Sequence, residues 1–253
     1  VALVLWPGVQ YASGQAFDLA RVAAAAHHAG ARIGFDLAHH IGNLPLSLHD
    51  SGCDFAAWCH YKYLNAGPGA VGGCFVHERH HNATDLPRFN GWWGNARQSR
   101  FRMAHDFDAE HGADAWQVST PLLLSMAPLR ASRRLFDEAG TVRVRNKSVD
   151  LTGYLIRGIR EYLHDLLEIL TPSEPERRCS QLSLRVRSGR EDGRALFEYL
   201  EEQGVLTDWR EPDVIRVAPV PLYNCFRDCF DLLKTLKNWQ TLTGNPTGRS
   251  TSG

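Results

Sequence analysis

Two charged residues at the ends of predicted strands could do chemistry together. Asp36 follows the apolar run RIGF, and Lys62 follows the run DFAAWC within the segment CHYKYLN. In an open α/β sheet, ligands bind at the carboxyl ends of the parallel strands. A carboxylate and an amine there would suit pyridoxal phosphate, which needs a Schiff-base lysine and an acidic partner for its pyridinium nitrogen. Aspartates and lysines are common at strand ends, so this pair alone is a weak signal.

The elements that would position this pair form an α/β pattern. Short apolar runs alternate with a helical segment in the first 76 residues, as in parallel βαβ units. The segment 16–30 is rich in alanine and ends in a glycine, which is typical of a helix with a C′ glycine. We therefore expect a mostly parallel sheet with helices on both faces. Its predicted elements are strands over 1–6, 32–36, 54–59 and 71–76 and a helix over 16–30.

The rest of the chain predicts long loops and then a smaller α+β domain. Residues 77–115 are polar, and such loops often carry function. Further helices are expected over 119–140, 146–170, 193–204 and from about 224, with strands over 180–187 and 214–220. The predicted division is a large domain over 1–140, a small domain over 141–242 and a disordered tail over 243–253, whose composition is that of a linker.

Composition excludes several classes of partner. The 253 residues are 43% hydrophobic and 22% charged, as in ordinary globular proteins. Basic and acidic residues number 28 each, so no overall field favours nucleic acid or an acidic membrane surface, and a small-molecule substrate is expected. No apolar stretch reaches the roughly 20 residues that span a bilayer. Six cysteines without a CxxC pair indicate reduced thiols in a cytoplasmic protein.

Two motifs suggest a metal but lack the necessary spacing. HERHH, over 77–81, does not have the HExxH spacing that places two histidines on one helical face, so we expect a solvated strand end. Cys225 and Cys229 stand one helical turn apart without a second pair of ligands. The opening run VALVLW has no initiator methionine, and we expect the chain to be incomplete at its N-terminus.

Four motifs together resemble the kynureninase family. They are GFDLAHHIGN (34–43), DFAAWCHYKYLNAGPGAVGGCFVHERH (54–80), GWWGN (91–95) and IRVAPVPLYN (215–224). The resemblance runs from about Pro7 to Phe230 and covers roughly the latter half of a kynureninase. It implies the fold-type-I architecture of pyridoxal-phosphate enzymes and a homodimer with its active site at the subunit interface. The implied reaction, in tryptophan catabolism, is hydrolysis of the Cβ–Cγ bond of L-kynurenine to anthranilate and L-alanine.

The resemblance also implies roles for single residues. Lys62 would form the Schiff base and shuttle the α-proton, and Asp36 would pair with the pyridine nitrogen. His39 would lie beside the cofactor. Tyr61 would hydrogen-bond the cofactor phosphate and donate a proton, and Trp92 would contact that phosphate from the partner subunit. A packing role is the alternative for His39 and for Trp92, and Trp93 could make the phosphate contact instead of Trp92.

Further residues are expected to bind the substrate or to complete the cofactor site. Arg216 suits a bidentate grip on the substrate α-carboxylate, and the alternative is a salt bridge at the rim. Thr120 is counted with the cofactor site and stands where some relatives carry asparagine. Asn95 is counted with the substrate site and stands where some relatives carry histidine. Both differences favour kynurenine over 3-hydroxykynurenine. Pro7 occupies a place where relatives often carry a serine near the cofactor.

Two other readings stay open. Another fold-type-I enzyme, a desulfurase or an aminotransferase, would share Asp36 and Lys62. A desulfurase needs a mobile loop with a nucleophilic cysteine, and none of the six cysteines stands in an evident one. The chain could also be an inactive polypeptide of half length.

Overall fold

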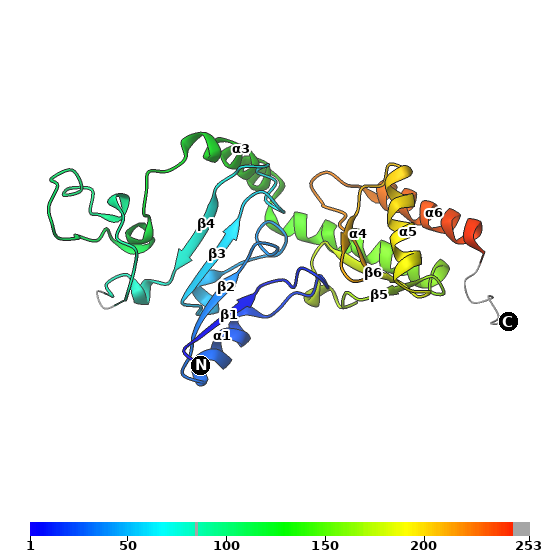
Figure 1. Cartoon of the computed structure of the whole chain (residues 1–253), viewed down its shortest axis with the longest axis horizontal. Coiled ribbons are helices and arrows are strands. Elements are labelled where there is room, and N and C mark those ends of the chain that lie inside the picture. Colours follow the sequence, from blue (N-terminus) through cyan, green and yellow to red (C-terminus); the bar gives the residue numbers. More distant parts are fainter. Residues whose placement is uncertain (84–85, 245–253) are drawn as a thin grey trace. The chain divides into compact units, whose positions relative to one another are not determined.

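The computed structural model describes residues 1–83 and 86–244, which form two compact units (Figure 1). The first unit holds residues 1–8, 17–42 and 46–137. The second holds residues 9–16, 43–45 and the chain from Glu138 onward. The predicted domain bounds, 1–140 and 141–242, stay a prediction. Of the predicted tail, 243–253, residues 245–253 lie outside the described residues.

The first unit is built on a four-stranded sheet in the order β1-β2-β3-β4 (Figure 1). Its strands are β1 (Leu3–Pro7), β2 (Arg32–Asp36), β3 (Phe55–Cys59) and β4 (Gly72–Val76). The first three pair in parallel, as expected, but β4 pairs antiparallel to β3. The sheet is thus mostly parallel, and β4 is its antiparallel strand because residues 60–71 contain no crossover helix of the kind that a parallel return needs.

Helix α1 (Leu19–His28) covers one face of this sheet. The Asp18 side chain accepts a hydrogen bond from the Arg21 backbone N–H at 3.0 Å, which caps its first turn. Small residues on its inner side, Ala23 and Ala26, allow a close approach to Ile33 and Phe35, and all four are buried in one cluster. A second, short helix, α2 (Leu48–Ser51), precedes β3.

Between β4 and helix α3 (Leu123–Ala139) the described residues, 77–83 and 86–122, have an irregular backbone, as predicted. These residues contain three 3₁₀ turns: η1 (Glu78–His80), η2 (Trp92–Gly94) and η3 (Gly112–Trp116). Helix α3 begins later than the predicted residue 119. Pro121 explains the delay, because the residue before a proline is disfavoured in helical conformation.

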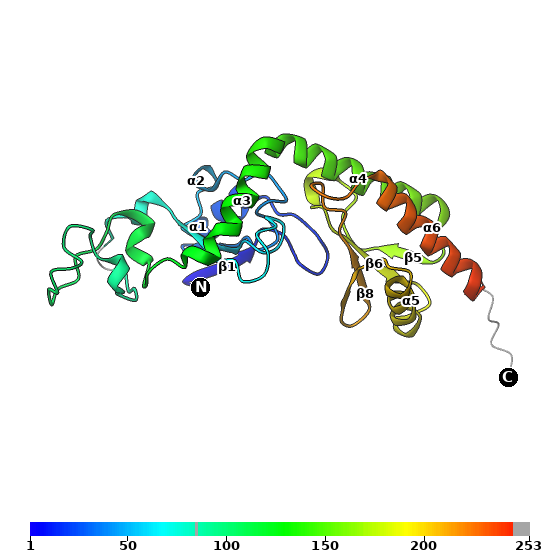
Figure 2. The same ribbon diagram turned by 90° about the horizontal axis from the view of Figure 1, so that it is seen from above.

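The second unit has a four-stranded sheet in the order β5-β6-β8-β7, antiparallel throughout. Figure 2 labels three of its strands, β5, β6 and β8. Its strands are β5 (Leu167–Ile169), β6 (Leu182–Val186), β7 (Asp208–Arg210) and β8 (Val214–Val217). Its helices are α4 (Thr141–Tyr162), α5 (Arg190–Glu202) and α6 (Phe226–Thr243), with the 3₁₀ turn η4 (Pro175–Arg177) before β6.

Two features of this unit differ from the prediction. The predicted helix over 146–170 is wrong beyond Tyr162, because Leu163 leaves helical geometry and residues 167–169 pair with β6. The apolar positions there fit a buried strand equally well, so their spacing could not decide. Strand β7 was not predicted at all, since its three residues, DWR, have no apolar alternation.

The two faces of the second sheet differ in character. Residues from α4, α5 and α6 form one apolar core with one face of the strands, including Leu184 and Ile215. The opposite face presents polar residues such as Ser183 and Arg216, which are Cα partners in the ladder. Residues 9–16 pack against this polar face. The second unit is therefore completed by a segment that follows β1 in the sequence.

Candidate active site

The loops that follow β2 and β3 leave the same edge of the first sheet. Asp36, the last residue of β2, is the Cα partner of Ala57 in β3, and both strands run in parallel. Lys62 lies in the loop that begins just after Cys59. The structure therefore places Asp36 and Lys62 at neighbouring carboxyl ends of the sheet, as the sequence predicts.

Direct contacts hold these two loops together. The rings of His39 and Tyr63 lie edge to face with 6.2 Å between their centroids. Gly42 has a φ of +75°, and a Cβ there would lie 2.7 Å from the Tyr63 carbonyl oxygen, so only glycine fits. On another side, the Ser132 hydroxyl of α3 donates to the Leu64 carbonyl. The backbone around Lys62 is thus packed between the β2 loop and α3.

His60 anchors the start of the Lys62 loop, and sequence reasoning missed it. Its Nε2 accepts a hydrogen bond from the Trp58 indole N–H at 2.8 Å, so its Nδ1 carries the proton and donates to the Val71 carbonyl at 2.6 Å. The Ala66 backbone N–H in turn donates to the His60 carbonyl at 3.0 Å. The spacing of Trp58 and His60, two residues apart at a strand end, was the available signal.

Tyr61 and Lys62 lie side by side at the solvent-facing end of this loop. The Lys62 Nζ lies 5.7 Å from the centroid of the Tyr61 ring, within range of a cation–π interaction. The Tyr61 side chain is exposed, and the neighbouring Cys59 thiol raises the pKa of its hydroxyl by electrostatic repulsion and by hydrogen bonding. A tyrosine hydroxyl is already protonated at neutral pH, and the raised pKa extends this form to higher pH, which suits a proton donor.

Asp36 and the adjacent histidines differ in burial. The Asp36 carboxylate is exposed, and its Oδ1 accepts a hydrogen bond from the Ala38 backbone N–H at 2.9 Å. His39 is half-buried against Tyr63. His40 is buried and lies close to Gly8, because a Cβ built on Gly8 would lie 2.8 Å from the His40 Nδ1. His39 is thus the histidine of the pair that lies nearer the Lys62 loop.

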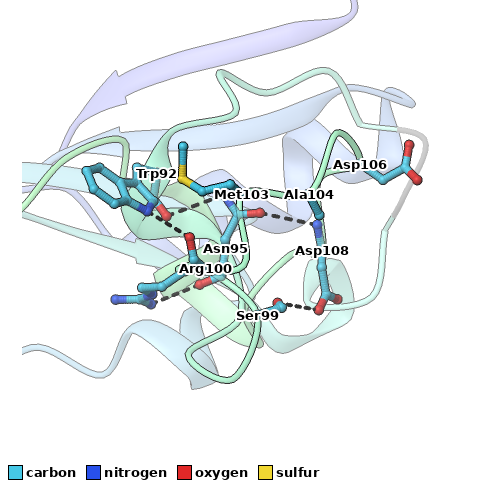
Figure 3. Close-up of a pocket in the computed structure, with 8 residues that line it drawn as sticks. All are labelled: Trp92, Asn95, Ser99, Arg100, Met103, Ala104, Asp106 and Asp108. Atoms are coloured by element: carbon cyan, nitrogen blue, oxygen red, sulfur yellow. Dashed lines mark hydrogen bonds between the residues drawn. The ribbon is translucent and has the colours of Figure 1, made fainter.

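Trp92 and Asn95 line one small pocket in the irregular segment of the first unit (Figure 3). The pocket has a volume of about 260 Å³. The Trp92 indole N–H donates to the Arg100 carbonyl at 2.9 Å, and the Asn95 amide donates to the Gly91 and Trp92 carbonyls at 3.3 Å. Thr120 is exposed and is not among the residues that line this pocket.

Arg216 belongs to the second unit. Its side chain is only 11% exposed and forms an ion pair with Asp208 on the neighbouring strand. Its Nη1 also donates to the Tyr11 carbonyl at 2.8 Å. Sequence reasoning missed Asp208, because the strand that carries it was not predicted.

A second polar cluster lies at the opposite, amino end of β3. The carboxylate of Asp54 accepts hydrogen bonds from the Ile33 backbone N–H at 2.8 Å, from His27 at 2.9 Å and from His80 at 2.7 Å. Burial alone would raise the pKa of Asp54, but these hydrogen bonds lower it to about 2. The expectation that HERHH is a solvated strand end is wrong for His77 and His80, which are both buried.

Within the described residues, no helix is both long enough and apolar enough to cross a lipid bilayer.

Solved structures share the fold of this chain at low sequence identity. The cystine C–S lyase C-DES, in complex with its product cysteine persulfide, matches with a TM-score of 0.78 and 24% identity over 94% of this chain and 61% of its own. An alanine–glyoxylate aminotransferase from Nostoc sp. matches with a TM-score of 0.71 and 17% identity over 94% of this chain and 61% of its own. The expected α/β, fold-type-I architecture is confirmed.

Sequence comparison identifies much closer relatives. Residues 144–236 match the kynureninase C-terminal domain. The kynureninase of Xanthomonas euvesicatoria pv. vesicatoria (strain 85-10) is 61% identical over 239 residues, which are 94% of this chain and 56% of that protein. The kynureninase of Stenotrophomonas maltophilia (strain K279a) is 60% identical over 96% of this chain and 57% of its own length. The chain thus spans somewhat more than half the length of these relatives, and the resemblance to the kynureninase family is confirmed along nearly all of this chain.

Proposed function

We propose that this chain acts in a pyridoxal-phosphate-dependent kynureninase, which hydrolyses L-kynurenine to anthranilate and L-alanine. The observation that carries the proposal is the identity of about 60% with kynureninases over 94% of the chain. Lys62 and Asp36, the residues that the reaction needs most, lie within the matched length and at neighbouring strand ends.

The charges at these strand ends fit the cofactor. No ion pair engages Asp36 or Lys62 among residues 1–83 and 86–244, so a carboxylate and an ammonium are both available on neighbouring loops. Asp36 would pair with the pyridinium nitrogen, and Lys62 would hold the cofactor through its amine. In one solved structure of the fold neighbour C-DES, glycine is covalently linked to the PLP cofactor of that enzyme. When bound, pyridoxal phosphate supplies an electron sink for the carbanion that forms on the substrate.

The residues of the chain supply binding and proton transfer. The Lys62 amine would remove the α-proton of the substrate. Tyr61, whose pKa is raised by Cys59, would donate a proton to Cβ, the carbon that becomes the methyl group of L-alanine after C–C cleavage. Arg216 would hold the α-carboxylate with its guanidinium fork.

The remaining site residues are assigned by the same resemblance. His39 would lie beside the cofactor, and Trp92 would contact its phosphate from the partner subunit of a homodimer. Trp92 is more than half exposed, which supports a role toward a second copy. Thr120 and Asn95 would lie toward the ring of the substrate. The six cysteines are all free, which supports a cytoplasmic location.

A related activity is the second candidate, because the fold neighbours carry the names of a C–S lyase, cysteine desulfurases and an aminotransferase. Their identities of 15 to 24% stand against about 60% for the kynureninases, so the first candidate is preferred. An inactive polypeptide is the third.

The assay for this proposal measures anthranilate release from kynurenine and 3-hydroxyanthranilate release from 3-hydroxykynurenine, with the natural full-length protein and added pyridoxal phosphate. We expect release from kynurenine at the higher rate. Lys62→Ala should abolish it, whereas Lys234→Ala, which changes an exposed lysine on α6, should not. No release from either substrate would overturn the proposal.

A further inference from the structure

The ladder of the second sheet places a carboxylate directly opposite Arg216. Asp208 of β7 and Arg216 of β8 are Cα partners, so their side chains leave the same face of the sheet. The Arg216 Nη2 forms an ion pair with the Asp208 Oδ2. The strand register, and not a chance surface encounter, therefore determines this contact.

The second terminal nitrogen of the guanidinium, Nη1, has a hydrogen-bond partner of its own. The Arg216 Nη1 donates to the Tyr11 carbonyl oxygen at 2.8 Å, and the Gln181 Nε2 donates to the same oxygen at 2.9 Å. Gln181 is buried, and its Nε2 also donates a hydrogen bond to the Ser183 Oγ at 3.0 Å. The carbonyl that orients Arg216 is thus itself fixed by a buried side chain.

The backbone that supplies this carbonyl is tightly held. The Ser183 hydroxyl donates to the Ala12 carbonyl at 2.6 Å, and the Thr171 hydroxyl donates to the Ser13 carbonyl at 2.6 Å. A Cβ at Gly14 would lie 2.9 Å from the Gln181 carbonyl oxygen. The segment 11–14 therefore cannot move away from the sheet without losing several hydrogen bonds, of which those from Ser183, Thr171 and Gln181 are partly buried.

Charge balance at the cluster leaves one positive charge. Asp208 also forms an ion pair with Arg210 at 3.0 Å, so one carboxylate lies between two guanidinium groups. The three side chains carry a net charge of about +1 at neutral pH, since arginine stays protonated there.

We propose that Asp208 is a positioning residue for substrate binding. Together with the Tyr11 carbonyl, it fixes the plane of the Arg216 guanidinium so that the fork is already oriented when the α-carboxylate of an amino acid substrate arrives. This inference rests on the proposed function, because it takes Arg216 as the group that binds that carboxylate. A guanidinium held at two nitrogens loses little conformational entropy when a ligand binds it.

The test compares Asp208→Asn with the unchanged protein in steady-state kinetics with kynurenine. We expect KM to rise about tenfold while kcat changes little. An effect of this size is typical when one of two residues in direct contact is replaced. Asp208→Glu should restore part of the loss. The matched control is Asp213→Asn, which breaks an ion pair of 2.8 Å to Arg185 in the same sheet and should leave KM unchanged.

A second readout separates positioning from a general loss of structure. The Asp208→Asn substitution should weaken inhibition by substrate analogues that carry the α-carboxylate, but not by the corresponding amines that lack it. An unchanged or lowered KM, or equal weakening of both inhibitor types, would overturn the inference. If the protein without substitutions releases no anthranilate, the proposed function itself fails. If that protein is active but the Asp208→Asn variant has the same KM, only the inference about Asp208 fails.

Discussion

Tyr61 illustrates how a neighbouring side chain can prepare a residue for proton donation. A phenol can donate a proton only while it is protonated, and the Cys59 thiol raises the pKa of Tyr61. The raised pKa extends the pH range over which the donor is competent. Cys59 is the last residue of β3, and Tyr61 follows it two residues later in the loop.

Removing the hydroxyl should slow turnover without unfolding the protein. For Tyr61→Phe we expect kcat for kynurenine to fall about a hundredfold, the lower range for loss of a general acid. The thermal midpoint should hardly move, because the side chain is exposed. A kcat equal to that of the unchanged protein would exclude Tyr61 as the donor.

The pH profile tests the influence of Cys59 separately. Cys59→Ala should lower the pKa of Tyr61 toward its ordinary value, so the alkaline limb of the kcat profile should move to lower pH. Cys74→Ala, on the adjacent strand, is the matched control and should leave the limb in place. If the Cys59→Ala limb does not move, the titrating group on that limb is not Tyr61.

At the scale of elements, Asp54 joins α1, β2, β3 and the turn η1. Its side chain is only 3% exposed and accepts hydrogen bonds from His27, from His80 and from the backbone of Ile33. A buried carboxylate with this many donors stabilises the fold only while it stays charged.

Stability should therefore depend on the charge of Asp54. Asp54→Asn should lower the free energy of unfolding by about 3 kcal/mol, as when one partner of a buried ion pair is removed. Asp50→Asn, in the exposed helix α2, is the control and should have almost no effect. Denaturant titration of both variants measures the difference in their free energies of unfolding. Equal midpoints for Asp54→Asn and Asp50→Asn would show that the Asp54 cluster does not contribute to stability.

The acid dependence of stability follows from the same pKa. The pKa of Asp54 is lowered to about 2 in the folded state, so its contribution is present above the ordinary value of 3.8 and is lost as the pH falls toward 2. The contribution amounts to roughly 2 kcal/mol. Denaturant titrations between pH 5 and pH 2 should show a steeper loss for the unchanged protein than for Asp54→Asn.

At the scale of the whole molecule, the sequence predicts what depends on local pattern. The strand ends that carry Asp36 and Lys62 follow from apolar runs and were predicted nearly to the residue. The contact of His39 with Tyr63 and the pairing of Asp208 with Arg216 depend on which strands become neighbours, and local pattern does not contain that information. The resemblance to a family supplied residue roles, but it did not identify Asp208 as the carboxylate that pairs with Arg216.

The outer strand of the first sheet should make the chain prone to association. Within the described residues β1 is an edge strand, and its Leu5 is 64% exposed. Edge strands with exposed apolar side chains pair readily with other chains, and a lysine there opposes such pairing. For Leu5→Lys we expect less self-association of this chain in sedimentation velocity. Leu206→Lys, at an exposed leucine outside any strand, should have little effect, and equal effects of both would contradict the role of β1.

The central claim is that Lys62 carries the cofactor, and reductive trapping tests it most directly. The chain has four lysines, Lys62, Lys147, Lys234 and Lys237. The natural full-length protein would be loaded with pyridoxal phosphate, reduced with borohydride, digested and analysed by mass spectrometry. The account predicts a phosphopyridoxyl group on Lys62 and none on the other three. Modification of a different lysine, or no modification after loading, would contradict it.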